Sequence, residues 1–295
     1  MRILLTGKNG QVGFELQRTL APLGEVIAVD YEECDLANPN AIRQLVAKIK
    51  PRIIVNPAAY TAVDKAESEP ELALAINADA PGVFGEEAKK LGALVVHYST
   101  DYVFDGCMPG AYLETDAPNP QSIYGRTKLA GERALKASGA DHLIFRTSWV
   151  FGAHGSNFAK TVLRLAAERD VLKIVADQFG APTSAALLAD VTAQVIGQYQ
   201  RRERTEFPFG LYHLVADGYT TWHEYAQLVV QAALDAGKPL KLRAEHIVPI
   251  STSEYPLPAS RPANSRLDTR RLRDTFGVRL HAWQSGLDQV LQQLL

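Results

Sequence analysis

The sequence predicts an α/β fold in which a doubly wound parallel sheet is followed by a smaller, mixed α/β domain. Apolar runs alternate with helix-like segments through the first half of the chain. These runs are continuous, which is typical of strands that are buried on both faces. A glycine-rich turn directly follows the first run. Together these observations favour a parallel sheet that is covered by helices on both sides.

The expected elements alternate regularly in the first half of the chain. Strands are predicted at residues 3–5, 26–29, 53–55, 94–96 and 143–145. Helices are predicted at residues 11–20, 39–49, 71–90 and 122–137. Pro39 suits the first turn of its helix because its φ is already helical. Beyond residue 150 the alternation loosens, and further helices are predicted at residues 157–168, 185–199, 222–236 and 284–294.

Composition excludes several classes of protein. The chain has 295 residues, of which 46% are hydrophobic and 22% charged, and this usage rules out a disordered chain, a coiled coil or a fibre. The net charge of −2 gives no general attraction to nucleic acid. No apolar run reaches the ~18–20 residues that a membrane span needs. Cys34 and Cys107 have no zinc-site spacing, and we expect reduced thiols in a cytoplasmic protein.

Three glycines form a turn between the first strand and the first helix. Gly7 permits the tight turn, Gly10 lets the backbone approach a pyrophosphate, and Gly13 lets helix and strand pack closely. The N–H groups at the start of the helix would then face the phosphates. The turn therefore predicts a dinucleotide-binding site of the Rossmann type.

An acidic residue supports this interpretation. Asp30 ends the second strand, where a carboxylate binds the 2′-hydroxyl of an adenosine ribose. It favours NADH because it would repel a 2′-phosphate, whereas Lys8 offers a cation nearby and leaves NADPH open. We accordingly expect a dinucleotide-binding domain over residues 1–150. Residues 151–295 would form mainly the substrate-binding domain, with some segments returning to the first.

A hydroxyl, a phenol and an amine are expected to meet beyond the fourth strand. Tyr124 and Lys128 share one face of a predicted helix, and Thr100 ends a buried strand, where parallel sheets place ligands. Reduction of a carbonyl needs a proton on oxygen. The Lys128 ammonium at ~4 Å would favour the phenolate by ~4 kcal/mol at an effective dielectric of 20. We therefore expect the pKa of Tyr124 to fall toward neutrality, with Thr100 holding the carbonyl oxygen and Lys128 the nicotinamide ribose.

Several blocks of sequence resemble one family over nearly the whole chain. The glycine spacing GxxGxxG resembles the extended short-chain dehydrogenase/reductase superfamily. Within it, the resemblance is to the dTDP-4-dehydrorhamnose reductase family. The similar blocks are residues 7–13, 56–64, 99–104, 124–132, 146–150, 177–183 and 261–265.

The resemblance implies an activity and a set of site residues. The enzyme would reduce the C4 ketone of dTDP-4-dehydro-L-rhamnose to dTDP-L-rhamnose with NADH or NADPH, in dTDP-rhamnose and hence lipopolysaccharide biosynthesis. The implied catalytic residues are Thr100, Tyr124 and Lys128. The implied cofactor-binding residues are Gly10, Gln11, Val12, Asp30, Asp35, Leu36, Ala59, Tyr60, Thr61 and Tyr98, beside Gly7 and Gly13 of the turn. Asp101 and Trp149 would contact the sugar nucleotide.

Two further residues are predicted from their chemistry to bind the substrate diphosphate. Arg261 has the geometry that suits a phosphate, and Asn157 is the second candidate. Trp149 offers a flat face for a sugar or a base, although a place in the core would equally explain it. Asn157 and Arg261 carry less support than the motif residues, because an arginine in a proline-rich loop is usually solvated.

Magnesium and the oligomeric state stay open. Some family members bind magnesium at a dimer contact through acidic side chains. Glu15 matches one such ligand, but Ala186 and Gln292 or Gln293 stand at the other places and lack carboxylates. The sequence therefore argues against a magnesium-bridged dimer and leaves a monomer or another homodimer.

Two alternative functions are weighed against the reductase. A nucleotide-sugar epimerase or dehydratase has the same fold, but a dehydratase would need an acid–base carboxylate pair, and Tyr102 follows Asp101 here. A non-catalytic regulatory subunit, such as the relative that associates with methionine adenosyltransferase, need not keep a complete set of hydroxyl, phenol and amine. Thr100, Tyr124 and Lys128 are all present, and this favours the enzyme.

Overall fold

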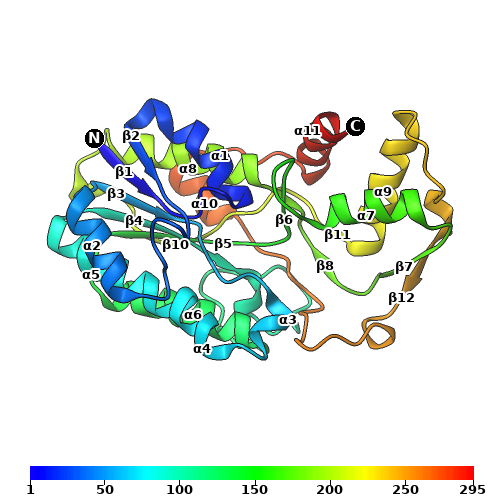
Figure 1. Ribbon diagram of the computed structural model, residues 1–295, viewed down its shortest axis with the longest axis horizontal. Coiled ribbons are helices and arrows are strands. Elements are labelled where there is room, and N and C mark those ends of the chain that lie inside the picture. The colour runs from blue at the N-terminus through cyan, green and yellow to red at the C-terminus, as the bar shows by residue number, and fades with distance from the viewer.

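A six-stranded parallel sheet forms the centre of the larger part of the molecule (Figure 1). The computed structural model describes residues 1–295. The strand order is β10-β5-β4-β3-β1-β2, and every neighbouring pair is parallel. The strands are β1 (Arg2–Leu5), β2 (Glu25–Ala28), β3 (Ile53–Asn56), β4 (Leu94–Thr100), β5 (His142–Thr147) and β10 (Gly210–His213). The predicted doubly wound α/β fold is confirmed.

Helices cover both faces of this sheet. One face packs against α2 (Pro39–Ile49), α5 (Ala80–Leu91) and α6 (Ile123–Ala137), and the other against α1 (Gln11–Leu20), α8 (Ala185–Tyr199) and α10 (Arg270–Phe276) (Figure 1). Leu4 points into the first layer, whereas Ile3 and Leu5 point into the second. A strand with apolar neighbours on both faces needs a continuous apolar sequence, which explains why the runs do not alternate.

One predicted helix is divided into three pieces. The segment predicted at 71–90 contains α4 (Pro70–Leu74), a π-helical turn η2 (Ala75–Asp79) and α5, and a short α3 (Val63–Ala66) precedes it. The π turn carries Asn77, whose side chain is buried and bonded to the backbone of Tyr60. Apolar periodicity cannot reveal one extra residue in a turn, so the interruption was not predicted. Such turns are frequent at functional sites.

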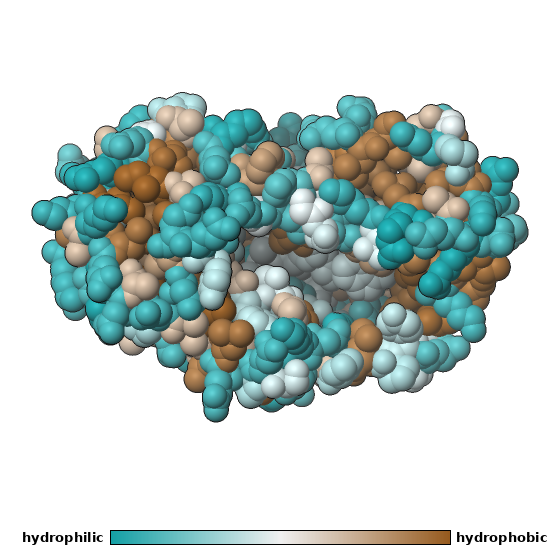
Figure 2. Space-filling model, in the orientation of Figure 1, coloured by the Kyte–Doolittle hydropathy of each residue, from teal (hydrophilic) through white to brown (hydrophobic).

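A smaller second part lies beside the first, and Figure 2 shows the surface hollowed between them. Its paired strands are β7 (Leu172–Val175) with β12 (Ile247–Ile250), β6 (Val150–Phe151) with β9 (Thr183–Ser184), and β8 (Phe179–Gly180) with β11 (Thr220–Thr221). Its helices are α7 (Phe158–Glu168), α9 (Trp222–Asp235) and the C-terminal α11 (Trp283–Leu294). Short 3₁₀ turns complete the chain at η1 (Ala21–Leu23), η3 (Asp101–Val103), η4 (Arg204–Glu206), η5 (Ala244–His246) and η6 (Thr252–Glu254).

The chain beyond residue 150 contributes to both parts. Strand β10 adds to the edge of the main sheet beside β5, and α8 and α10 cover one of its faces. Strand β10 was not predicted, because its four residues include only two apolar side chains, Leu211 and Tyr212. We propose that the first domain consists of residues 1–150 together with these returning segments. No helix is both long enough and apolar enough to cross a membrane.

Candidate active site

The sheet order creates a crevice where dinucleotides commonly bind. Strand β1 pairs with β2 on one side and β3 on the other, so the connections diverge at its carboxyl end. A cavity lies there. The cavity is lined by five residues of the predicted cofactor set, namely Gly7, Asp30, Asp35, Leu36 and Ala59. It is also lined by six residues that were not predicted, namely Thr6, Val29, Tyr31, Cys34, Ala58 and Ile76. Thr6 and Val29 directly follow the ends of β1 and β2, which is the signal that could have identified them.

The glycine turn has the geometry of a phosphate cradle. Gly7 has a φ of +61°, which side chains rarely adopt. A Cβ at Gly13 would lie 1.9 Å from the Gly7 carbonyl oxygen, so helix α1 can approach the turn only through a glycine. Helix α1 starts after Gly10 with no side chain capping its first N–H groups. These residues therefore fit a pyrophosphate at the helix N-terminus.

Asp30 lines the cavity, and Lys8 is close enough for the two charges to interact. The Asp30 carboxylate accepts hydrogen bonds from the backbone N–H groups of Asn9 (2.9 Å) and Tyr31 (2.8 Å). Lys8 forms an ion pair with Glu33, and the hydrogen bond that it donates to that carboxylate raises the pKa of Lys8. The cation expected to offset Asp30 is therefore already partnered by Glu33.

Two other predicted cofactor residues are held by contacts that the sequence did not reveal. The backbone of Tyr60 is fixed by the Asn77 amide, and its phenol donates to Glu69 at 2.6 Å. The phenol of Tyr98 is bonded to Thr192 of α8 at 2.6 Å, inside the core. Only the backbone of Tyr98 faces α6, where its carbonyl accepts a hydrogen bond from Lys128. A contact between the Tyr98 side chain and the cofactor stays a prediction.

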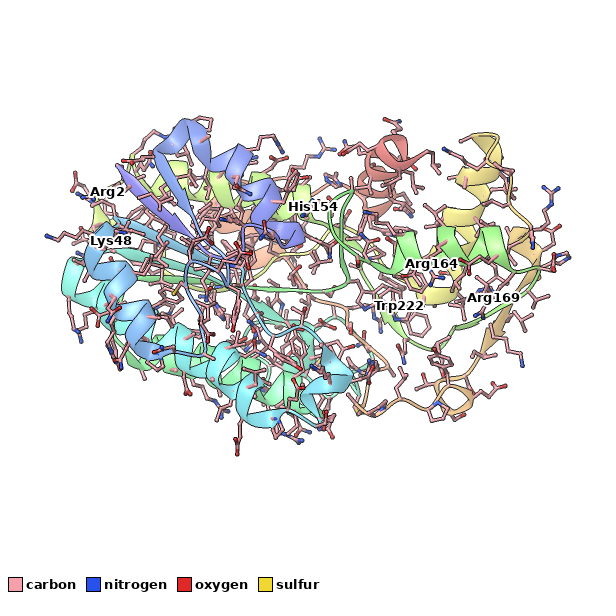
Figure 3. The ribbon with its side chains drawn as sticks, in the orientation of Figure 1. Arg2, Lys48, His154, Arg164, Arg169 and Trp222 are labelled. Carbon is pink, nitrogen blue, oxygen red and sulfur yellow. The ribbon has the colours of Figure 1, made fainter.

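Gln11 joins the glycine turn to the second part. Its amide nitrogen donates to the Val150 carbonyl at 3.3 Å, and its oxygen accepts from Asn157 at 3.0 Å. His154, labelled beside α1 in Figure 3, stacks on Phe14 with 4.1 Å between ring centroids. The start of α1 thus contacts both the turn and the substrate-domain loop, which places the crevice at the joint between the two parts.

The three predicted catalytic residues meet beyond the end of β4. Thr100 is the last residue of β4, while Tyr124 and Lys128 lie on the first turns of α6. A Cβ at Gly125 would lie 2.2 Å from the Tyr102 carbonyl oxygen, so a glycine is required for α6 to start this close to η3. The Thr100 hydroxyl interacts with the phenol of Tyr124.

The expected effect of the lysine on the tyrosine is wrong. Burial raises the pKa of Tyr124 to about 12, and the Thr100 hydroxyl lowers it by less. The Lys128 amine is 2% exposed and donates instead to the Tyr98 carbonyl at 2.6 Å, with the His97 Nε2 at 3.3 Å. Burial lowers the pKa of Lys128 to about 8. Desolvation therefore outweighs the attraction that we expected to stabilise the phenolate.

Asp101 places a buried carboxylate beside this group. Its Oδ1 accepts from the Thr100 hydroxyl at 3.0 Å, and its Oδ2 is buried with no hydrogen-bond partner. Burial raises the pKa of Asp101 to about 6, although Ser265 and Thr100 both lower it. An unpartnered buried oxygen is costly in a folded protein and suits a hydroxyl donor from a ligand. A contact with the sugar nucleotide stays a prediction.

Trp149 lies where the two parts meet, in a strained conformation. Its φ is +48°, and its ring stacks on Trp222 with 3.6 Å between centroids. Figure 3 labels Trp222 in the second part. A Cβ at Gly180 would lie 2.5 Å from the Trp149 ring. Strained residues of this kind cluster at ligand sites, and the ring is half-buried rather than part of the core.

The remaining predicted ligands already have partners. Asn157 begins α7, where its oxygen accepts from the Lys160 N–H and its nitrogen donates to Gln11 and to the Gly152 carbonyl. Arg261 makes two hydrogen bonds of 2.7 Å with the Asp64 carboxylate. Their contacts with the diphosphate stay predictions. Glu15 lies 3.4 Å from Arg18, and magnesium binding there likewise stays a prediction.

Comparison with known proteins identifies the family. The family model described as RmlD substrate binding domain matches residues 1–295. The dTDP-4-dehydrorhamnose reductase of Escherichia coli K12 is 53% identical over 298 residues, covering 100% of this chain and 98% of the relative. The chain belongs to the dTDP-4-dehydrorhamnose reductase family.

Solved structures of this reductase family support the same assignment. The crystal structure of a dTDP-4-dehydrorhamnose reductase from Clostridium acetobutylicum matches with a TM-score of 0.90 and 38% identity, covering 100% and 99% of the two chains. The enzyme from Bacillus anthracis, solved in complex with NADP, matches with a TM-score of 0.87 and 35% identity, covering 99% of each chain. The resemblance inferred from the sequence is confirmed.

Proposed function

We propose that the protein reduces the C4 ketone of dTDP-4-dehydro-L-rhamnose to give dTDP-L-rhamnose, with NADPH or NADH as reductant. The observation that supports the proposal is the contact of the Thr100 hydroxyl, at the end of β4, with Tyr124 of α6, together with the hydrogen bond from Lys128 to the Tyr98 carbonyl of the same strand. We place the enzyme in the cytoplasm, as a monomer or homodimer, in keeping with its free Cys34 and Cys107.

Different site residues donate the proton, hold the carbonyl oxygen and bind the cofactor. When bound, the reduced nicotinamide supplies the hydride to the ketone carbon. Tyr124 donates its phenolic proton to the carbonyl oxygen, and the Thr100 hydroxyl turns its proton from Asp101 to that oxygen and holds it by a hydrogen bond. Since the pKa of Tyr124 is about 12, the phenol keeps its proton at neutral pH until the oxygen develops negative charge. Lys128 binds the nicotinamide ribose.

A coupled assay tests the substrate. The purified protein is given dTDP-4-dehydro-6-deoxyglucose together with a 3,5-epimerase, and the absorbance of NADPH or NADH is followed. Oxidation is expected only when the epimerase is present, because the ketone substrate forms only then. Oxidation without the epimerase would exclude this substrate. A protein that retains oxidised cofactor through purification would be an epimerase, and one inactive with every carbonyl compound would be the regulatory subunit.

Cofactor choice is expected to depend on Asp30. Asp30→Ala should lower the ratio of kcat/KM for NADH to kcat/KM for NADPH by roughly tenfold, because a hydrogen bond to a charged group contributes about 1.5 kcal/mol. Glu32→Ala is the matched control, since it removes the same charge from an exposed residue of the same turn. An unchanged ratio in Asp30→Ala, or no turnover of the parent with NADH, would refute the role of Asp30.

A further inference from the structure

A continuous chain of buried polar contacts runs from the glycine turn to Lys128. The Thr6 hydroxyl donates to the Asn56 side-chain oxygen at 2.6 Å. The Asn56 amide nitrogen lies 3.2 Å from His97 Nδ1, and His97 Nε2 lies 3.3 Å from Lys128 Nζ. The chain ends at the Tyr98 carbonyl, which accepts from Lys128 Nζ at 2.6 Å. It crosses three neighbouring strands of the sheet, β1, β3 and β4.

The proposed mechanism gives no role to the middle of this chain. Thr6, Asn56 and His97 are each 1% exposed, and Thr6 adjoins Gly7 in the cofactor cavity. His97 interrupts the apolar run of β4, all of whose residues are buried. Polar side chains are costly at such positions unless each one is hydrogen-bonded, and here each one is. The three residues therefore form a connected path between the cofactor turn and Lys128.

The charge of Lys128 decides which imidazole nitrogen carries the proton. Thr6 donates to Asn56, so the Asn56 amide presents its NH₂ group to His97. With Nδ1 accepting from this amide, a neutral ring carries its proton on Nε2, facing Lys128. An uncharged amine can accept from Nε2–H while donating to the Tyr98 carbonyl. An ammonium can only donate, so it requires the other tautomer, in which Nε2 accepts from Nζ and Nδ1–H donates to Asn56.

We propose that His97, oriented by Asn56 and Thr6, is a positioning residue that holds Lys128 Nζ and couples the charge of Lys128 to the tautomer of its own ring. When Lys128 takes a proton from solvent, the single proton of His97 moves from Nε2 to Nδ1, where Asn56 accepts it, and Nε2 accepts a hydrogen bond from Nζ. The imidazole stays neutral throughout. The inference deepens the proposed function and rests on it, because Lys128 is the residue that it concerns.

Several other charged and titratable groups surround Lys128. Glu132, one turn further along α6, raises the pKa of Lys128, and its carboxylate is itself paired with Arg146 of β5. Tyr124 lies one turn earlier on α6, and Tyr98 presents its carbonyl from β4. Burial, and to a smaller extent the Lys128 charge, lower the pKa of His97, which agrees with a neutral ring. Only His97 contacts Nζ with a group whose donor and acceptor roles can exchange.

Two variants of His97 separate positioning from a merely structural role. In His97→Gln the amide reaches the place of Nε2 and keeps a contact with Lys128, whereas in His97→Asn it reaches only the place of Nδ1. We expect kcat within about threefold of the parent for His97→Gln, and a loss of about tenfold to a hundredfold for His97→Asn, with KM for the sugar nucleotide unchanged. Equal kcat values in the two variants would overturn the positioning role.

A titration without cofactor tests the coupling independently of activity. The protein is labelled with ¹³C-lysine, and the Lys128 signal is assigned as the one missing from Lys128→Met. In His97→Phe, which keeps the ring shape without its nitrogens, we expect the Lys128 titration midpoint to rise, because charging Lys128 then no longer requires the ring at position 97 to change tautomer. An unchanged or lower midpoint would overturn the inference. An inactive parent would instead count against the proposed function.

Discussion

Replacing Tyr124 by phenylalanine is expected to lower kcat by about two to four orders of magnitude, while NADPH binding is retained. The phenol interacts with the Thr100 hydroxyl, and its pKa of about 12 keeps it protonated at neutral pH. Phenylalanine keeps the ring contact with Tyr102, in which the centroids lie 5.5 Å apart. The loss should therefore fall on the chemical step. Steady-state kinetics and NADPH titration by fluorescence would measure the two quantities.

The neighbouring tyrosine supplies the control for this experiment. Tyr102 packs edge-on against Tyr124, and burial raises the pKa of its phenol as well. Tyr102→Phe removes the same atom from an adjacent ring, and kcat should stay within a few-fold of the parent. A near-normal kcat in Tyr124→Phe would contradict the assignment of the proton donor. Equal losses in both variants would show that ring packing, and not proton donation, had been disturbed.

The sequence alone correctly predicted those structural features that follow from a single physical cause. The runs that include Ile3, Ile53 and Leu94 are continuous because their strands are buried on both faces, and they predicted the sheet correctly. The glycine turn was equally predictable from the sequence, since Gly13 stands where any Cβ would collide with the Gly7 carbonyl. Both features follow from local sterics and burial, so a single sequence carries them.

The environment of each site residue was less predictable. Lys128 was expected to stabilise the Tyr124 phenolate, but its amine is held by the Tyr98 carbonyl and His97, which lie on β4, 30 and 31 residues away in the sequence. The Asp64 carboxylate that pairs with Arg261 is 197 residues distant. Such partners depend on the register of strands and loops in space. Spacing along the chain identified the chemical groups but not their hydrogen-bond partners.

A buried ion pair behind the catalytic group is expected to dominate stability. The Glu132 carboxylate accepts from Arg146 at 2.8 and 2.6 Å and from the Ser99 hydroxyl at 2.5 Å. The side chains of Arg146 and Glu132 are 4% and 6% exposed. Arg146→Met should lower the free energy of unfolding by about 3–5 kcal/mol, because it leaves the Glu132 charge buried without its partner. Urea unfolding followed by fluorescence would measure the loss.

A double variant separates the contribution of this ion pair to stability from its contribution to the position of α6. Glu132→Met combined with Arg146→Met removes both charges, so most of the lost stability should return. Catalysis should not return with it, because Glu132 lies one turn after Lys128 and Ser99 precedes Thr100, so their hydrogen bond ties α6 to the end of β4. We expect a stable double variant with kcat about tenfold below the parent. Full activity in that variant would mean that the ion pair serves folding alone.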